Sequence, residues 1–256
     1  MIHPSALVDP LARIADSVEI GAFSIIGPDV EIGEGTSIGP HVVIEGPTRI
    51  GRDNKIHQFN SLGGPPQDKK YAGEPSRLEI GDRNVIREYC TFNRGTEQGG
   101  GVTRIGSDNW IMAYVHIAHD CVLGSGCVLA NAATLAGHVR VDDKVILGAF
   151  TVVHQFCAIG QFAFSAMGSV VFKDVPPFVT VSGNSAQPHG INSEGLRRAG
   201  FEPQTIQALR RAYKTVYKKG LTLENALTEI TAQISECREV EPLVRFIEQS
   251  SRGLVR

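Results

Sequence analysis

Large aliphatic residues recur at every sixth position along most of the first 171 residues of the chain. A period of six residues matches neither the helical period of about 3.6 residues nor the two-residue alternation of a half-buried strand. The pattern is typical of a hexapeptide-repeat solenoid, in which each repeat is a short strand followed by a turn. The repeat positions are Ile2, Val8, Ile14, Ile20, Ile26, Ile32, Ile38, Ile44, Ile50, Ile56, Leu62, Ile80, Ile86, Phe92, Ile105, Ile111, Ile117, Leu123, Leu129, Leu135, Val141, Leu147, Val153, Ile159, the polar Ser165 and Val171.

The residues around each repeat position indicate how the coil is built. Glycine often follows it, as at Gly21 and Gly124, where we expect a positive φ angle or a close approach of two backbones. Three hexapeptides predict a triangular coil of about 18 residues, and stacked coils pair as parallel strands about 4.8 Å apart. Small residues stand two positions before each repeat position, so the cysteines there are expected to be structural. They are Cys90, Cys121, Cys127 and Cys157.

The pattern is interrupted twice, by residues 63–79 and by the glycine-rich residues 93–104. Long loops in a regular solenoid are often functional and project from one face. The glycine-rich segment does not stand between a strand and a helix, so we do not interpret it as a dinucleotide-binding loop. We expect a repeat domain over residues 1–185 that carries both loops.

The chain changes to a helical pattern in residues 186–256. Pro203 suits the first turn of a helix that Gly220 would end, and Thr222 suits the N-cap of the next one. The predicted fold class is therefore mainly β, with an α-helical C-terminal region. Helices are expected over residues 203–219, 223–237 and 241–250.

Charge and composition narrow the functional classes. Lys and Arg total 25 against 27 Asp and Glu, so the chain lacks the global positive field expected of a nucleic-acid-binding protein. No apolar run approaches the roughly 18 residues that cross a bilayer, and the N-terminal segment does not resemble a secretory signal. Five cysteines in 256 residues do not suggest a disulfide framework. We therefore expect a cytoplasmic protein without membrane insertion or nucleic-acid binding.

His116, His119 and Asp120 are the polar residues of a segment whose other positions follow the repeat. Such side chains can ligate a metal, act as a general base with an orienting acid, or face solvent. A metalloenzyme would recruit His138 as a third imidazole for catalytic zinc. A non-enzymatic scaffold is a further alternative, because solenoids offer extended binding surfaces.

The coil length predicts which residues gather around His119. One coil after His119 comes Gly137, which adjoins His138, and two coils after it comes Gln155, which adjoins His154. These residues are therefore expected along one outer edge of the solenoid. An imidazole on this edge, with a pKa near neutrality, suits the general-base role.

Four motifs together resemble one family. They are VHIAHDC at 115–121, HQFCAIG at 154–160, QDKKYAGEP at 67–75 and GINSEGLRRAGF at 190–201. In this order along a hexapeptide repeat they resemble the UDP-N-acetylglucosamine acyltransferases, which catalyse the first step of lipid A biosynthesis. The resemblance implies a left-handed parallel β-helix and a homotrimer with active sites between adjacent chains. It also implies transfer of an (R)-3-hydroxyacyl group from acyl carrier protein to the sugar 3-hydroxyl, without a metal or organic cofactor.

The resemblance also implies roles for individual residues. His119 matches the catalytic base, Asp120 is a candidate to orient it, and the N–H of Ala149 matches the oxyanion donor. His116 could instead be a packing residue. The positions that match substrate contacts are Asp68, Lys70, His116, His138, His154 and Gln155, with Asn192, Glu194 and Arg198 at the nucleotide. Ala199 departs from a second arginine found in some members, which weakens the case for a paired-arginine diphosphate clamp, although Arg197 could partly substitute.

Met167 matches the position that limits acyl-chain length in this family, where glycine leaves a longer groove. A bulky residue there predicts a preference for 3-hydroxydecanoyl over 3-hydroxytetradecanoyl donors. The basic residues of the helix expected over 203–219 could dock the acidic acyl carrier protein, or could form an ordinary solvated face. The related N-acyltransferases carry an extra N-terminal domain, whereas in this chain the repeat starts at residue 2.

Overall fold

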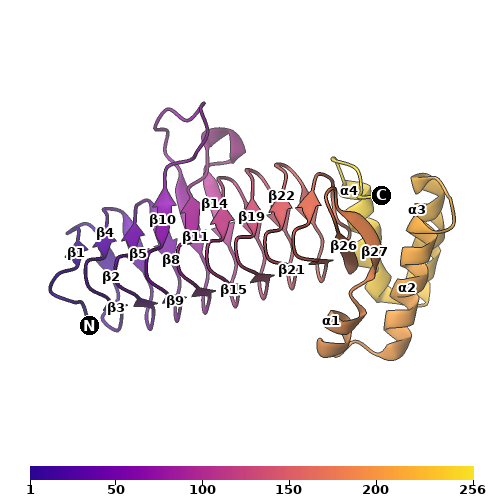
Figure 1. Ribbon diagram of the computed structural model, residues 1–256, viewed down its shortest axis with the longest axis horizontal. Helices are drawn as coiled ribbons and strands as arrows, with labels where there is room; N and C mark the ends of the chain where they lie inside the picture. The colour runs from indigo at the N-terminus through magenta and orange to yellow at the C-terminus, as the bar shows by residue number, and fades with distance from the viewer.

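The computed structural model describes residues 1–256 as an elongated three-sided prism with helices at its C-terminal end (Figure 1). Each side is one sheet, and the three sheets are named I, II and III. Sheet I contains β1 (Leu7–Val8), β4 (Ile25–Ile26), β7 (Val43–Ile44), β10 (Ser61–Gly64), β13 (Thr91–Asn93), β16 (His116–Ile117), β19 (Thr134–Leu135), β22 (Val152–Val153) and β25 (Val170–Val171). Sheet II contains β2 (Arg13–Ile14), β5 (Val30–Ile32), β8 (Thr48–Ile50), β11 (Arg77–Ile80), β14 (Val102–Ile105), β17 (Val122–Leu123), β20 (Arg140–Val141) and β23 (Ala158–Ile159). Sheet III contains β3 (Glu19–Ile20), β6 (Ser37–Ile38), β9 (Lys55–Ile56), β12 (Val85–Ile86), β15 (Trp110–Ile111), β18 (Val128–Leu129), β21 (Ile146–Leu147), β24 (Phe164–Ser165), β26 (Val179–Ser182) and β27 (Gln187–Ile191).

Strands that neighbour each other in a sheet belong to successive coils and run parallel. His116 pairs with Thr134, one coil later, and the register continues across the first loop, where Ser61 pairs with Thr91. The exception is the antiparallel pair of β26 and β27. The prediction of a parallel hexapeptide solenoid is therefore confirmed.

The turns between sheets form three edges of the prism. The chain runs from sheet I to II to III and back, so each edge collects residues one coil apart. Edge I–II includes residues 118–121, 136–139 and 154–157; edge II–III includes 124–127, 142–145 and 160–163; edge III–I includes 130–133, 148–151 and 166–169. Both predicted loops leave edge I–II, as residues 65–76 and 94–101, and project from the same side of the prism (Figure 1).

The interior is filled by the repeat residues and by the small residues before them. Ile117, Leu123 and their counterparts are buried in one continuous core. The four repeat cysteines are fully buried, and burial raises the pKa of Cys90, Cys121 and Cys127 to about 12, which agrees with structural thiols. The polar repeat residue Ser165 is buried too, and its hydroxyl bonds the Thr151 hydroxyl at 2.8 Å.

The glycines of the repeat permit close backbone contact rather than positive φ angles. A Cβ on Gly21 would lie 2.6 Å from the Gly39 carbonyl carbon of the next coil. Most of the positive φ angles in the repeat fall on non-glycine corner residues, among them Asp120 and His138, each with φ of 61°, although a few corner glycines such as Gly126 share them. Left-handed corners therefore carry functional candidates, which the sequence pattern did not indicate.

The C-terminal region contains four α-helices and two 3-10 turns, while a third turn, η1 (Glu97–Gly99), lies in the second loop. They are α1 (Ser193–Arg198), α2 (Pro203–Tyr217), α3 (Leu223–Ala232), η2 (Gln233–Ser235), η3 (Arg238–Val240) and α4 (Glu241–Gln249). Pro203 does open α2, and the Thr222 hydroxyl caps α3 by accepting from the Asn225 N–H. The helix expected to reach residue 237 ends at 232, and the short α1 was not predicted. The predicted boundary at residue 185 falls between β26 and β27.

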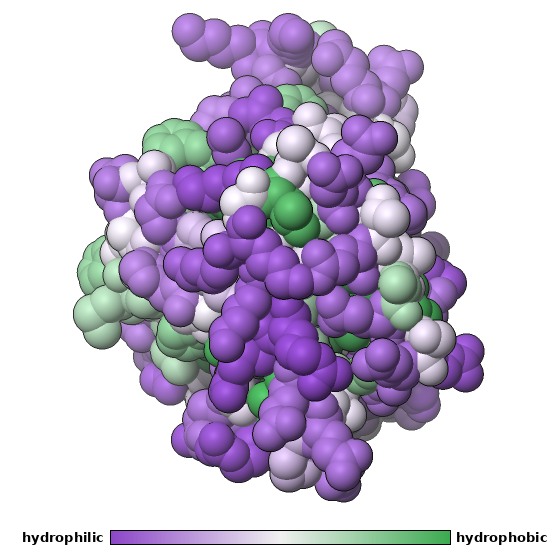
Figure 2. Space-filling view, turned by 90° about the vertical axis from the view of Figure 1, so that its right-hand side faces the viewer, coloured by the Kyte–Doolittle hydropathy of each residue, from purple (hydrophilic) through white to green (hydrophobic).

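The helices close the end of the prism with a second apolar core that includes Phe178 and Leu209. Buried Asp174 fastens the last residues to the solenoid, because its carboxylate accepts from the Ala158 N–H at 2.8 Å and the Ser250 hydroxyl at 2.6 Å. The outer surface of this end is mostly hydrophilic, as a terminal cap requires (Figure 2). None of the helices has the length and apolar character of a membrane span.

Candidate active site

His119 and Asp120 form a hydrogen-bonded pair on edge I–II. The His119 Nδ1 lies 2.8 Å from the Asp120 Oδ2. Because an ionised carboxylate only accepts, Nδ1 carries the hydrogen and Nε2 is left with its lone pair. His119 is partly exposed, whereas Asp120 is 7% exposed. The pair therefore presents one basic nitrogen to solvent from a buried anionic support.

Asp120 is held by the second loop. Its Oδ1 accepts from the Thr96 N–H at 2.8 Å, and its Oδ2 accepts from the Thr96 hydroxyl at 2.7 Å. Its own N–H donates to the Thr103 hydroxyl at 2.8 Å. Burial raises the pKa of this carboxyl, but the hydrogen bonds from His119 and Thr96 outweigh burial, so the pKa lies below its usual value. Asp120 is therefore ionised at neutral pH.

Gly137 and His138 lie beside His119, as the coil length predicts. A Cβ on Gly137 would stand 2.6 Å from the His119 ring, so only glycine allows this approach. The Gly137 N–H has no acceptor in the chain. The His138 ring meets the His119 ring edge-on at 5.1 Å and stacks on Phe156 at 4.5 Å. Burial lowers the pKa of His138, which favours its neutral form.

The other predicted histidines are placed differently. His116 is half-buried on sheet I, where its Nδ1 lies 2.7 Å from the Thr91 hydroxyl, and burial lowers its pKa. His154 is one of the residues that follow β22, and its Nδ1 approaches an Arg252 nitrogen at 3.3 Å. Gln155 is exposed next to it. All three lie near edge I–II, but none of them contacts Asp120.

The first loop carries Asp68 and Lys70. The Lys70 N–H donates to the Asp68 carboxylate at 3.0 Å, and the negative charge of Asp68 acts on the pKa of His138. Arg94 at the start of the second loop donates to the Tyr71 hydroxyl of the first loop at 3.4 Å. Both loops are thus connected to each other and lie over the edge that carries His119.

The predicted nucleotide residues line a separate groove of about 660 Å³ over sheet III and edge II–III. Asn192 caps α1 by accepting from the Gly195 N–H, and its amide also donates to the Phe162 carbonyl at 3.0 Å. Glu194 is paired with Arg198 at 3.0 Å. Further residues of the groove are Val128, Lys144, Ile146, Phe164 and Ala199. Lys144 is a cation that the sequence motifs did not single out.

Ala149 and Met167 lie one coil apart on edge III–I, away from His119. Within one chain the N–H of Ala149 therefore does not face His119, whereas Gly137 adjoins the His119 ring. The spacing agrees with this placement, because Gly137 follows His119 by one full coil and Ala149 does not. Met167 is 78% exposed.

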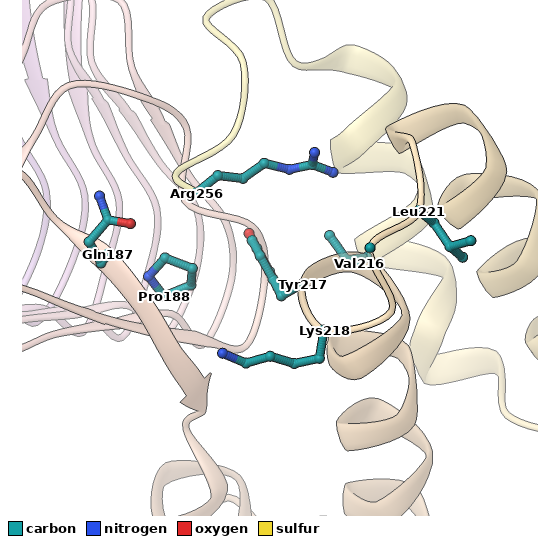
Figure 3. Close-up of a pocket in the computed structure, with 8 residues that line it drawn as sticks. Gln187, Pro188, Val216, Tyr217, Lys218, Leu221 and Arg256 are labelled. Atoms are coloured by element: carbon teal, nitrogen blue, oxygen red, sulfur yellow. The ribbon is translucent and has the colours of Figure 1, made fainter.

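A second cavity of about 270 Å³ lies between β27 and the end of α2 (Figure 3). The Tyr217 hydroxyl, Lys218 and Arg256 point toward it, beside Gln187 and Pro188 (Figure 3). It contains none of the site residues expected from the sequence. The residues expected to contact the sugar lie near edge I–II, and those expected to contact the nucleotide lie in the groove over sheet III.

The zinc alternative requires His116, His119 and His138 to lie close enough to share one ion. The three side chains close enough to share an ion are His119, Asp120 and His138, whereas His116 is engaged with Thr91. Asp120 already accepts hydrogen bonds on both oxygens, and His119 Nδ1 faces one of them. These contacts favour a hydrogen-bonded pair over the alternative of a three-histidine metal site.

Family models match both the repeat and the helical region of the chain. A family model described as UDP-N-acetylglucosamine O-acyltransferase, domain 2, matches residues 174–255, and a bacterial transferase hexapeptide model matches residues 11–46 and 103–137. An acyl-[acyl-carrier-protein]–UDP-N-acetylglucosamine O-acyltransferase of Herminiimonas arsenicoxydans is 59% identical over 100% of this chain and 99% of its own, and one of Thiobacillus denitrificans is 60% identical with the same coverage.

Solved structures extend the comparison to the fold. The UDP-N-acetylglucosamine acyltransferase of Francisella novicida matches with a TM-score of 0.98 at 45% identity, over 100% of this chain and 94% of its own. The LpxA structure from Acinetobacter baumannii matches with a TM-score of 0.98 at 48% identity, over 100% and 99%. The solenoid is accordingly a left-handed parallel β-helix. With the repeat, the histidine edge and full-length relatives in agreement, the chain belongs to the UDP-N-acetylglucosamine O-acyltransferase family.

Proposed function

We propose that the protein transfers an (R)-3-hydroxyacyl group from acyl carrier protein to the 3-hydroxyl of UDP-N-acetylglucosamine, the first step of lipid A biosynthesis. The enzyme class and both substrates follow the names of its relatives. The observation that carries the mechanism is the 2.8 Å bond between His119 Nδ1 and ionised Asp120, which leaves Nε2 free to accept a proton. The reaction is an acyl transfer that needs no cofactor.

The chemical step is a base-assisted attack on a thioester. His119 Nε2 removes the proton as the sugar oxygen bonds to the acyl carbonyl carbon, giving a tetrahedral oxyanion. The Gly137 N–H, unpaired and next to the His119 ring, can donate to this oxyanion. When the C–S bond breaks, the carrier thiolate takes the proton from the imidazolium. Asp120 stabilises the imidazolium through its charge.

The remaining site residues are proposed as substrate contacts. Neutral His138, with Asp68 and Lys70 on the loop above it, is suited to bind hydroxyl groups of the sugar and the polar start of the acyl chain. The residues proposed to contact substrate on the His119 side of the site are His116, His138, His154, Gln155, Asp68 and Lys70. Asn192, Glu194 and Arg198 are proposed for the nucleotide, and the cation Lys144 in their groove can add an attraction for the diphosphate.

The two halves of this site lie on different parts of one chain. His119 is on edge I–II, whereas the groove of Arg198 lies over sheet III, beyond sheet II. The surface of sheet II between them carries ion pairs such as Arg104 with Glu79, and no groove with the nucleotide residues. We therefore propose that the sugar bound at His119 places its nucleotide in the groove of a neighbouring chain.

The surface chemistry supports a trimer with this arrangement. Sheets I and III expose apolar residues such as Leu7, Val152 and Trp110, whereas sheet II carries ion pairs and, of the large exposed apolar residues, Val122. If sheet I of each chain faces sheet III of the next, edge III–I turns toward a three-fold axis. That edge carries a stack of exposed rings at centroid spacings between 4.9 and 5.3 Å, which an axis would cover. The stacked residues are Phe23, His41, Phe59, Tyr89 and Tyr114.

Mixed assemblies test the two-chain site. We expect His119→Ala and Arg198→Glu chains to be inactive alone and to recover activity when co-expressed with different tags and purified together. In a random trimer about one site in four would join an intact His119 edge to an intact groove, so about a quarter of the wild-type rate is expected. A mixed trimer of the His119→Ala and Arg198→Glu chains that remains inactive would place the whole site within one chain.

Gly137→Ala is expected to lower kcat by at least about 10²-fold, because the new methyl group would displace the His119 ring. The measurement is steady-state acyl transfer together with the melting temperature. Gly64→Ala is the matched control, since its nearest atom would be at an ordinary 3.5 Å. Equal losses in both variants, or none in Gly137→Ala, would argue against the tight fit of His119.

The experiment that tests the function is an acyl-transfer assay with UDP-N-acetylglucosamine and a series of 3-hydroxyacyl carrier proteins. We expect product with the wild type after treatment with chelator and no stoichiometric zinc by elemental analysis. Zinc that is required for activity would favour the metalloenzyme alternative. All five cysteines are free thiols, which fits the reducing cytoplasm, where we propose that the enzyme works.

A further inference from the structure

The glycine-rich second loop returns to the prism at Thr96, directly over the catalytic edge. Residues 94–101 leave sheet I after β13 and rejoin sheet II at β14. Thr96 is 4% exposed and caps η1 by accepting from the Gly99 N–H. Gly99 packs so closely on the Asp120 carboxylate that any side chain there would collide with it. The loop is thus shaped to contact Asp120.

Thr96 supplies a donor to each oxygen of Asp120. Its N–H donates to Oδ1 at 2.8 Å and its hydroxyl donates to Oδ2 at 2.7 Å. The direction of the hydroxyl is fixed, because its oxygen accepts from the Gly99 N–H at 3.2 Å and the carboxylate can only accept. This two-point contact fixes the rotation of the carboxylate.

The rotation of Asp120 matters because two histidines compete for it. Oδ2 lies 2.8 Å from His119 Nδ1 but also 3.6 Å from His138 Nε2. A small rotation of an unrestrained carboxylate would shorten the second distance at the expense of the first. Only the contact with His119 leaves a basic Nε2 for the sugar hydroxyl.

We propose that Thr96 is a positioning residue for acyl transfer: its hydroxyl holds the Asp120 carboxylate on His119 and away from His138. The inference rests on the proposed function, in which His119 is the base. The titratable groups that face this pair are His116 on sheet I, His138 on the same edge and Asp68 on the first loop. Thr96 itself does not contact the reacting atoms.

The experiment compares Thr96→Val, which removes the hydroxyl at constant shape, with Thr96→Ser, which keeps it. We expect Thr96→Val to lower kcat by about 10- to 100-fold, with KM for the sugar nucleotide changed less than about twofold. Thr96→Ser should retain about half of the wild-type kcat or more. Thr228→Val, at an exposed position of α3, controls for the loss of a threonine hydroxyl.

A second readout does not depend on activity. The low-field proton NMR signal of the His119 Nδ1–H, which is hydrogen-bonded to Asp120, should shift or broaden in Thr96→Val and keep its wild-type position in Thr96→Ser. An unchanged signal in Thr96→Val, or a Thr96→Ser variant as impaired as Thr96→Val, would overturn the inference. If the wild type transfers no acyl group while this signal changes as expected, the proposed function fails and the positioning by Thr96 stands.

Discussion

Replacement of His119 by alanine is expected to lower kcat/KM for acyl transfer by about 10²- to 10⁴-fold, the range of general-base catalysis. The reason is geometric, since His119 presents the free nitrogen of a pair whose other nitrogen is bound to Asp120 at 2.8 Å. The ring is partly exposed and fills no core position, so the melting temperature should change by a few degrees at most. Steady-state rates with a 3-hydroxyacyl carrier protein measure the effect.

The pH profile separates a base from a binding residue. Wild-type kcat/KM should have an acid limb, as general-base catalysis requires, and this limb should vanish in His119→Ala. His3→Ala, an exposed histidine in the first coil, is the control and should match the wild type. An alanine variant that keeps the rate and the acid limb of the wild type would contradict the role of His119 as the base.

Met167→Gly is expected to shift donor preference from 3-hydroxydecanoyl toward 3-hydroxytetradecanoyl chains. His119 and Met167 lie on the two edges that border sheet I, so an acyl chain can cross this face from one to the other. Val152, exposed on β22, provides an apolar surface along that path. Met167 is mostly exposed in one chain, and in the proposed trimer a neighbouring chain would cover it and make it the end of a groove.

The size of this shift follows from the apolar surface that the longer chain would bury. Its four additional methylenes are worth about 0.8 kcal/mol each, so the ratio of kcat/KM values can change by up to about 10²-fold. Competition of the two donors on wild type, Met167→Gly and Met167→Leu measures it, and the leucine variant should keep the short-chain preference. A wild type that clearly prefers the longer donor would refute the length-limiting role.

Most of the fold was predicted from the six-residue period of the sequence. Because every coil repeats the same geometry, spacing alone located Ile117 and Cys121 in the interior and brought His138 next to His119. Ala149, which the family resemblance implied as oxyanion donor, lies on edge III–I of the chain, away from His119. A helix of six residues such as α1 has too few positions for a periodic signal.

Contacts made by the loops could not be predicted in this way. Thr96 reaches Asp120 from a segment without a repeat, so no spacing rule relates the two residues. The positive φ angles at Asp120 and His138 were also missed, because glycine was expected to take them. The site is therefore most predictable where it follows the coil and least predictable where a loop completes it.

The most direct test of the central claim is the structure of the product. Purified protein, UDP-N-acetylglucosamine and 3-hydroxydecanoyl carrier protein should give a monoacylated sugar nucleotide, identified by mass spectrometry, with the acyl group on the sugar 3-hydroxyl by NMR. His119→Ala at the same concentration should give at most about one hundredth of that product in the same time. Acylation at another position, or equal product from the two proteins, would contradict the account.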